Sequence, residues 1–205
     1  MQSQECRTNP AGNRFAMAKK HRVCPPILGY LLTCPIRRWK QDPYKILAPH
    51  VRPGMTALDF GCAMGFFTLP LAEMVGEGGR VIAVDIQEKM LRALRRRAEK
   101  AGLSDRIVTV RSEADSPLPD TADSVDFALA FAVLHETPDA GRVLRALFRV
   151  LKSDRGGLLL AEPSGHVSAP EFAKTLEAAQ QAGFELVVER LAIWHSHAAL
   201  LDKPE

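Results

Sequence analysis

The chain has 205 residues, of which 46% are hydrophobic and 25% are charged, and its formal net charge is +3. This length favours one domain with a large core, and the composition is that of an ordinary globular protein. The absence of any run of about 18 apolar residues argues against a membrane span, and no secretion signal is apparent. The four cysteines form no C-x-x-C pair, so we expect reduced thiols in a cytoplasmic protein.

Positive charge is concentrated at the start of the chain. Residues 1–52 contain ten Lys or Arg and two Asp or Glu, a net of +8, which leaves −5 for the remainder. A basic arm of this kind can meet an anionic substrate or nucleic acid. It lacks a dense basic run with interleaved aromatic residues, so we interpret residues 1–22 as a flexible basic leader. The pattern leaves open whether Met1 or Met17 is the natural start.

The informative sequence begins after this leader. Prolines bound two apolar segments, CPPILGYLLTCPIRRW and DPYKILAPHV, which are typical of short helices over about residues 26–50. Farther along, short apolar runs alternate with amphipathic segments. The runs predict strands at Ala57–Phe60, Arg80–Asp85, Arg106–Arg111, Val125–Phe131 and Gly157–Ala161.

Helical patterns lie between these strands. One helix is expected from Phe66, one over Gln87–Ala101, one after Pro138, and one after the capping box at Ser168. This alternation predicts an α/β fold with a doubly wound, mostly parallel sheet covered by helices on both faces. Two consecutive strands close the chain and are expected to pair in antiparallel fashion. These last strands are Phe184–Arg190 and Leu191–Leu201, and residues 23–205 are predicted to form one domain.

The stretch ALDFGCAMGFFTLPL connects the first strand to the first helix of this pattern. Gly61 and Gly65 permit a tight turn and close approach of a ligand, and the helix start offers free N–H groups. The dinucleotide fingerprint G-x-G-x-x-G does not fit, because Ala63 and Phe66 occupy two of its glycine positions. The spacing D-x-G-x-x-x-G, with Asp85 ending the next strand, resembles the first motif of class I S-adenosylmethionine (SAM)-dependent methyltransferases.

This resemblance covers the chain from about Thr56 to the C-terminus. Within the class, the chain is similar to the small, single-domain methyltransferases of types 11 and 25. It implies a Rossmann-like sheet of seven strands with an antiparallel last strand. SAM, which leaves as S-adenosylhomocysteine, is expected at the carboxyl ends of the strands. The resemblance further implies that the helices at about 26–50 cover the cofactor. Ala63 departs from the family, which usually has glycine there.

The cofactor-binding residues are carried over from this resemblance. Asp59 and the glycine turn match positions that hold the methionyl part, and Asp85 matches the carboxylate that accepts from the ribose hydroxyls. Asp115 matches the acidic residue that accepts from the adenine amine, with Ala114 donating to the ring; a turn or helix cap is the alternative for Asp115. The predicted set is Asp59, Gly61, Cys62, Ala63, Gly65, Asp85, Ile86, Gln87, Ala114, Asp115, Phe131 and Ala132.

Two imidazoles and two carboxylates are expected beside that site. His135 and Glu136 follow the fourth strand, and Glu162 and His166 follow the fifth, so both pairs face one cleft. Methyl transfer depends largely on positioning, and a base is needed only where the acceptor loses a proton. We name His166, His135 and Glu136 as catalytic candidates, with His166 first, because a loop imidazole beside a glycine has fewer packing duties. For His135, a packing role is the alternative.

Two histidines near the end of the sequence raise the alternative of a metal site. His195 and His197 are two residues apart on an expected strand and would share a face, but no third ligand follows in the sequence, so we expect no metal. The sequence therefore predicts a SAM-dependent methyltransferase that acts on a small molecule as a monomer or homodimer, without a nucleic-acid partner. Two alternatives stay open, namely a methyltransferase of RNA or protein and a non-catalytic SAM-binding partner protein.

Overall fold

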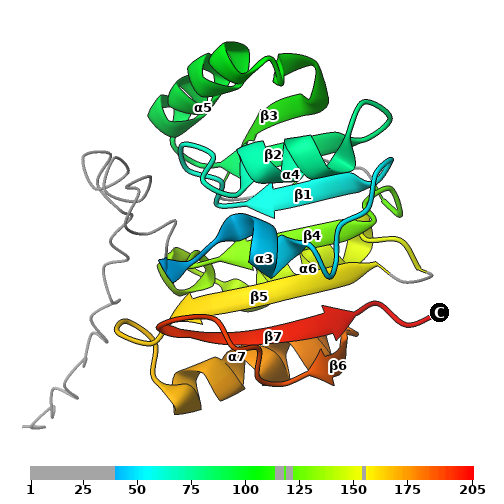
Figure 1. Ribbon diagram of the computed structural model, residues 1–205. Coiled ribbons are helices and arrows are strands. Elements are labelled where there is room, and N and C mark those ends of the chain that lie inside the picture. The colour runs from blue at the N-terminus through cyan, green and yellow to red at the C-terminus, as the bar shows by residue number, and fades with distance from the viewer. Residues whose placement is uncertain (1–39, 114–117, 119–121, 154–155) are drawn as a thin grey trace, which may run out of the picture.

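Figure 1 shows the computed structural model, which describes residues 40–113, 118, 122–153 and 156–205. Its centre is a seven-stranded sheet in the order β3-β2-β1-β4-β5-β7-β6. Neighbours from β3 to β5 are parallel, and β7 runs antiparallel to both β5 and β6. The predicted doubly wound sheet with a reversed last strand is confirmed. Its strands are β1 (Thr56–Phe60), β2 (Arg80–Asp85), β3 (Ile107–Arg111), β4 (Phe127–Phe131), β5 (Gly157–Pro163), β6 (Glu185–Val188) and β7 (Ser196–Asp202).

Helices cover both faces of this sheet (Figure 1). One apolar cluster joins α6 and α7 to one face, and a second joins α3 and α4 to the other face. The helix α5 packs on β2 and β3. The helices are α3 (Pro43–Leu47), α4 (Thr68–Val75), α5 (Glu88–Ala101), α6 (Ala140–Val150) and α7 (Ala169–Gln181), with short 3₁₀ turns η1 (Ser104–Arg106) and η2 (Leu134–Glu136).

Local sequence signals explain where several helices begin and end. The Ser168 side chain accepts from the N–H of Glu171, and the Glu171 side chain accepts from the N–H of Ser168, so the predicted capping box begins α7. Gly102 ends α5 in the left-handed conformation, with φ of 68°. Pro70 lies in the first turn of α4, where its missing N–H is tolerated.

The central strands leave only their ends open to a ligand. All five residues of β4 are buried, and so are the last four of β1 and the last five of β2. Strands covered on both faces read as continuous apolar runs, and this is why they were visible in the sequence. Because β1, β2, β4 and β5 are parallel, their carboxyl ends meet at one edge of the sheet. The candidate site lies along this edge.

The last predicted strand is wrong in its extent. The sequence predicts a strand over Leu191–Leu201, whereas β7 begins only at Ser196. His195 lies in a turn with φ of 49°, and residues 191–193 are irregular. His195 and His197 therefore do not share one strand face as predicted. The apolar run has no glycine or proline to mark the turn, so its periodicity gave no warning.

The described part of the N-terminal region packs on the domain. The Gln41 side chain donates to the Trp194 carbonyl at 2.9 Å, and the Tyr44 hydroxyl donates to the Glu73 carboxylate in α4. The helix α3 lies within the predicted helical range of about 26–50. The leader at 1–22, Met17 and three of the cysteines (Cys6, Cys24 and Cys34) lie outside the described residues. Of the helices built from described residues, none has the length and apolarity to cross a membrane.

Candidate functional site

The turn after β1 forms the first part of the candidate site. Gly61 and Gly65 have positive φ angles of 78° and 84°, a backbone region that favours glycine. A Cβ on Gly61 would lie 2.5 Å from Cγ2 of Val133, and one on Gly65 would lie 2.4 Å from Cδ1 of Leu94. A side chain at either position would displace its neighbour. The turn is therefore fixed against α5 and against the segment that follows β4.

Ala63 lies at the centre of this turn with φ of 46°, where the resembled family usually has glycine. The left-handed region costs a residue with a Cβ roughly 1–2 kcal/mol. The N–H of Ala63 donates to Oδ2 of Asp85 at 2.9 Å, and the Arg97 guanidinium of α5 donates to the Met64 carbonyl. Contacts from β2 and α5 thus support the turn despite the missing glycine.

Asp85 ends β2 with its carboxylate beside the glycine turn. Besides the bond from Ala63, its Oδ1 accepts from the N–H of Gln87 at 2.7 Å. Burial raises the pKa of the Asp85 carboxyl above its ordinary value, and the two backbone hydrogen bonds oppose that rise. Each carboxylate oxygen retains capacity for a further hydrogen bond. Asp85 can therefore accept from two neighbouring hydroxyls, as the predicted ribose role requires.

Asp59 is a buried carboxylate inside β1, only 3% exposed. Its Oδ2 accepts from the hydroxyl of Thr68 at 2.6 Å. Burial raises the pKa of Asp59 to about 7, the hydrogen bond from Thr68 opposes the rise, and the charge of Asp85 adds to it. A carboxylate so placed is stabilised by a nearby cation, which suits the ammonium group of the methionyl part of SAM.

The other predicted cofactor residues differ in their surroundings. Cys62 is buried, and burial raises the pKa of its thiol well above the ordinary value, so this cysteine packs rather than reacts. The ring of Phe131 lies 4.6 Å from that of Phe67, between centroids. Ile86, by contrast, is 49% exposed directly after Asp85. It supplies apolar surface at the place where the resemblance puts the adenine.

These features fit the cofactor that the resemblance implies. Gly61 and Ala63 of the turn are partly exposed, two carboxylates flank the turn, and an exposed apolar side chain adjoins it. Ala132, directly after β4, has φ of 57° and donates its N–H to the Ala161 carbonyl at 2.7 Å. Ala114 and Asp115, the predicted adenine partners, lie outside the described residues. Their roles, like the roles of the whole predicted set, stay predictions.

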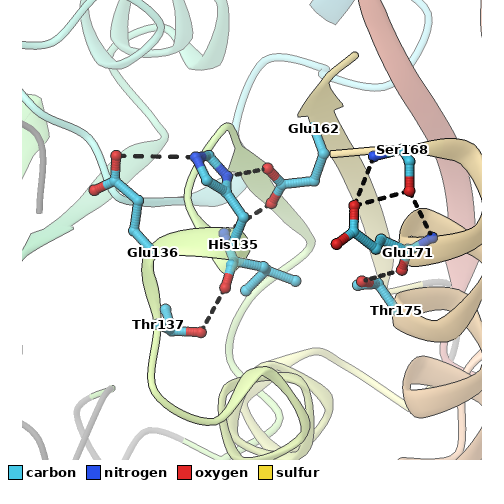
Figure 2. A network of polar contacts seen from close by, with 8 residues as sticks. His135, Glu136, Thr137, Glu162, Ser168, Glu171 and Thr175 are labelled. Carbon is cyan, nitrogen blue, oxygen red and sulfur yellow. Dashed lines mark hydrogen bonds and ion pairs between the residues drawn. The ribbon is translucent and has the colours of Figure 1, made fainter. Parts of the chain in front are cut away.

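The second part of the candidate site follows β4 and β5 (Figure 2). Nδ1 of His135, in η2, lies 2.5 Å from Oε2 of Glu162 in β5. Oε1 of the same carboxylate accepts from the N–H of Leu134 at 2.8 Å. The hydrogen bond with Glu162 raises the pKa of the His135 imidazole; burial opposes this, and the charges of Glu162 and Glu136 reinforce it. Because Glu162 is only 1% exposed, its carboxylate needs hydrogen-bond partners inside the protein, and His135 and the N–H of Leu134 provide them.

The other two polar groups lie farther from His135. Oε1 of Glu136 is 4.0 Å from Nε2 of His135, and the His166 ring centroid is 5.7 Å from that of His135. The four groups predicted to face one cleft are thus close together. The direct partner of His135 is Glu162, which the sequence placed in the cleft without a catalytic role. The available signal was a carboxylate ending a buried apolar strand, which needs a partner.

The described residues contain no arrangement suited to a metal ion. No three His, Cys, Asp or Glu side chains in that part of the chain are placed to hold a metal ion. The His197 ring instead stacks on Phe172 of α7, with centroids 5.7 Å apart. His195 lies next to Trp194, with ring centroids 4.2 Å apart. Aromatic packing therefore accounts for both histidines near the start of β7.

Comparisons with known proteins agree on one family. A model described as a methyltransferase domain matches residues 52–198. The ubiquinone/menaquinone biosynthesis C-methyltransferase UbiE of Pectobacterium carotovorum is 33% identical over 141 residues, 68% of this chain and 51% of that protein. The demethylmenaquinone methyltransferase of Lactobacillus johnsonii is 33% identical over 152 residues, 68% of this chain and 61% of that protein. The chain thus spans between half and two thirds of the length of these relatives.

Solved structures give the same result. A SAM-dependent methyltransferase from Aquifex aeolicus matches with a TM-score of 0.79 and 26% identity, over 88% of this chain and 100% of that chain. A putative SAM-dependent methyltransferase from Methanococcus maripaludis matches with a TM-score of 0.71 over 88% of this chain and 90% of that chain. At 16% identity, this second match shows the fold alone.

Proposed function

The chain belongs to the family of SAM-dependent methyltransferases, and we propose that it transfers a methyl group from SAM to a small-molecule acceptor. SAM supplies a methyl group on a sulfonium centre, which is a strong electrophile. The protein must then bind the cofactor and hold the acceptor in line with the methyl group, and this positioning provides much of the rate. Binding and positioning correspond to the two parts of the candidate site.

The observation that carries the proposal is the carboxylate of Asp85 beside the glycine turn. Asp85 would hold the ribose, Asp59 would face the ammonium group, and Ile86 would pack on the adenine. The backbone of residues 61–65 would pass beneath the methionyl part. These assignments follow from the family resemblance, and the carboxylates of Asp59 and Asp85 and the exposed Ile86 at the ends of β1 and β2 support them.

The small-molecule acceptor is supported by the relatives and by the second part of the site. Of the two relatives with 33% identity, one is named a ubiquinone/menaquinone biosynthesis C-methyltransferase and the other a demethylmenaquinone methyltransferase. An aromatic ring related to a quinone is therefore the first acceptor to test. The match covers only 51% and 61% of these relatives, so their acceptors do not apply to this chain directly, and a quinone-like acceptor is our proposal. His135 and Glu162 would lie on the acceptor side of the cofactor.

Calorimetric titration with SAM tests the cofactor assignment. Asp85→Ala would leave two hydroxyls without their charged acceptor, and hydrogen bonds to charged groups contribute roughly 1.5–3 kcal/mol. We expect SAM affinity to fall by about 2 kcal/mol, or roughly 30-fold. The matched control is Asp105→Ala, an exposed aspartate in η1, which should bind SAM as the wild type does. Unchanged affinity in folded Asp85→Ala would reject the ribose assignment.

A screen with radiolabelled SAM tests the acceptor. Label is followed into small aromatic compounds, total RNA and a protein mixture under one set of conditions. We expect incorporation into the small aromatic compounds. Incorporation into RNA or protein alone would contradict the small-molecule proposal. SAM binding without any transfer in all three panels would favour a non-catalytic SAM-binding protein.

A further inference from the structure

We infer that Glu162 positions His135 so that Nε2 of His135 accepts a proton from the methyl acceptor, and that the acceptor is a phenol or an enol. This inference rests on the proposed function and deepens it by naming the acceptor class. It concerns two side chains with separate roles. His135 would be the catalytic base, and Glu162 would be a positioning residue that acts through it.

The geometry around Glu162 leaves little freedom to the imidazole. The two carboxylate oxygens are engaged separately, Oε2 with Nδ1 of His135 and Oε1 with the N–H of Leu134 (Figure 2). The turn that carries His135 is closed by the Thr137 hydroxyl, which donates to the Leu134 carbonyl at 2.7 Å. Both the ring and its backbone are therefore tied to one buried carboxylate. A side chain held in this way is pre-organised for its task.

The chemistry of the pair assigns the tautomer of His135. An ionised carboxylate only accepts hydrogen bonds, so Nδ1 of His135 must carry the proton directed at Glu162. In the neutral ring, Nε2 is then the atom with the free lone pair. Nε2 faces Oε1 of Glu136 at 4.0 Å, which is beyond hydrogen-bond distance, and the His135 side chain is 22% exposed. This atom is therefore available to a bound molecule.

The charged and titratable neighbours of His135 favour the protonated ring that such a step creates. They are Glu162 from β5, Glu136 from η2 and His166 from the loop after β5. The two carboxylates raise the pKa of the imidazole, and burial opposes them. A proton taken up at Nε2 is thus stabilised by charge on both sides of the ring.

The position of the pair relates it to the cofactor. Val133 lies against Gly61, since a Cβ on that glycine would come within 2.5 Å of it. His135 follows two residues later, at the edge formed by the carboxyl ends of β1, β4 and β5. This part of η2 is therefore adjacent to the turn that would carry the methionyl part of SAM. An acceptor beside the methyl group would come within reach of this edge.

The proton balance selects the acceptor class. The O–H proton moves to Nε2 of His135, the electron pair left on the acceptor forms the new bond to the methyl carbon, and the sulfur keeps the electrons of the broken S–C bond as S-adenosylhomocysteine. A phenolic hydroxyl has a pKa near 10, and an imidazole near 6.5, so this transfer is feasible with a modest gap. A thiol, with a pKa near 8.5, ionises in part without help. Compared with a thiol, a phenol or enol therefore gains more from this base.

Nuclear magnetic resonance of the imidazole nitrogens tests the pair without an acceptor. Wild-type His135, assigned by comparison with His135→Asn, should show the proton on Nδ1 when neutral and should titrate above 6.5. In Glu162→Gln the amide presents a donor to Nδ1, so the proton should move to Nε2, and the pKa should fall by about one unit or more. Glu177→Gln, the same exchange at an exposed position of α7, should match the wild type.

An unchanged tautomer and pKa of His135 in Glu162→Gln would overturn the inference. Should that variant fail to fold, Glu162→Asp retains the charge and draws the carboxylate back by one methylene. The His135 pKa in Glu162→Asp should then lie below that of the wild type. A value equal to the wild type would overturn the inference equally well.

SAM titration and methyl transfer separate this inference from the proposed function. SAM affinity should be equal in the wild type and in Glu162→Gln. Failure of the wild type to bind SAM would reject the proposed function, but it would leave the pairing of His135 with Glu162 as the magnetic resonance experiment finds it. With phenols as acceptors, turnover should rise with pH through the His135 pKa and should fall about 100-fold in Glu162→Gln. Transfer restricted to pyridines, which lose no proton on methylation, would overturn the acceptor class.

Discussion

The two parts of the candidate site are held together by different kinds of contact. At the ends of β1 and β2, the arrangement depends mainly on glycine backbone conformations and on backbone hydrogen bonds. Asp85 accepts two of these hydrogen bonds, from the N–H groups of Ala63 and Gln87. At β4 and β5, one pair of side chains decides the arrangement, since His135 and Glu162 bond across 27 residues of sequence. The part proposed for the cofactor thus depends on the backbone, and the part proposed for the acceptor depends on side chains.

This difference has a functional consequence. A cofactor common to a whole family needs a binding site of constant shape. Backbone conformation can provide this shape even where the surrounding side chains differ. An acceptor that differs between members needs groups that can be exchanged without disturbing the fold. Substitutions in the first part should therefore affect stability and SAM binding together. Substitutions in the second part should affect chemistry with smaller effects on either.

The largest effect is expected from Gly61→Ala, at the contact between the two parts. The new Cβ would meet Val133, and the residue would have to keep its φ of 78°. Left-handed strain of roughly 1–2 kcal/mol and overpacking of roughly 1–3 kcal/mol together predict a loss of about 3 kcal/mol in the free energy of unfolding. Urea denaturation measures this loss, and SAM titration should show weakened binding in the same variant.

Two further variants divide the loss into its causes. Gly102→Ala has a similar φ of 68° but no atom within 4 Å of the added Cβ, so it should lose only about 1 kcal/mol. Adding Val133→Ala to Gly61→Ala should remove the overpacking and recover part of the stability. Equal losses in Gly61→Ala and Gly102→Ala would show that the two parts of the site are not coupled through this contact.

The fold could be predicted from sequence because its signals are local. Buried parallel strands read as apolar runs, and Ser168 and Gly102 mark helix ends by capping chemistry. The extent of β7 could not be predicted in this way. His195 adopts a left-handed conformation, which is uncommon for any residue other than glycine, and the sequence does not mark it.

The candidate site follows the same rule. The turn with Asp59 and Asp85 could be predicted because its residues have fixed spacing. The pairing of His135 with Glu162, rather than with His166, depends on how β4 and β5 align in the sheet, where Phe131 lies opposite Ala161. The sequence predicts that both histidines lie at the cleft, but it does not predict their distances from Glu162. A long-range side-chain pair leaves no local pattern to read.

The next effect concerns the support of the turn by α5. Arg97→Met removes the hydrogen bond to the Met64 carbonyl while keeping an apolar stem of similar length. Hydrogen bonds to charged groups contribute roughly 1.5–3 kcal/mol when buried, and Arg97 is only half-buried, so we expect a loss of about 1.5 kcal/mol in stability. Thermal unfolding measures it. Arg96→Met, the exposed neighbour, should change stability by less than about 0.5 kcal/mol, and an equal effect in both would reject this support.

A pH effect of similar size is expected in SAM binding through Asp59. In the free protein the pKa of Asp59 is about 7, because burial disfavours its charge. The cationic cofactor favours the ionised carboxylate, so affinity should rise as the pH rises through 7 and should be up to about tenfold higher at pH 8 than at pH 6. Titration calorimetry in buffers of different ionisation heat should detect a proton released on binding near pH 6.5.

Asp59→Asn is the control for this pH effect. It should remove the proton release and the part of the pH dependence that belongs to this carboxyl. The same group affects folding, because its native pKa exceeds the ordinary value near 4. The native state therefore binds the proton more tightly, and wild-type stability should decline as the pH rises from about 4 to 7. A pH profile of stability that is identical in Asp59→Asn would contradict the raised pKa.

The smallest effect separates the two parts of the site at matched positions. Ala63 and Ala132 both have positive φ, 46° and 57°, the first in the turn after β1 and the second after β4. Replacing alanine by glycine relieves roughly 1–2 kcal/mol of backbone strain in the folded state. The same change lowers the free energy of unfolding by roughly 0.4–1 kcal/mol, because the unfolded chain gains conformational entropy. Each alanine-to-glycine variant should thus be about 0.5 kcal/mol more stable in urea denaturation.

SAM affinity should respond more strongly to the first of these two substitutions. The N–H of Ala63 is bound to Asp85, so a glycine there loosens or re-aims the carboxylate that would hold the ribose. The N–H of Ala132 is bound to the Ala161 carbonyl, between the strands of the acceptor part. Both alanines belong to the predicted cofactor set, but if the glycine turn holds most of the cofactor, calorimetry should find a larger change of SAM affinity in Ala63→Gly than in Ala132→Gly. A change confined to Ala132→Gly would mean that the end of β4, and not the glycine turn, governs cofactor binding.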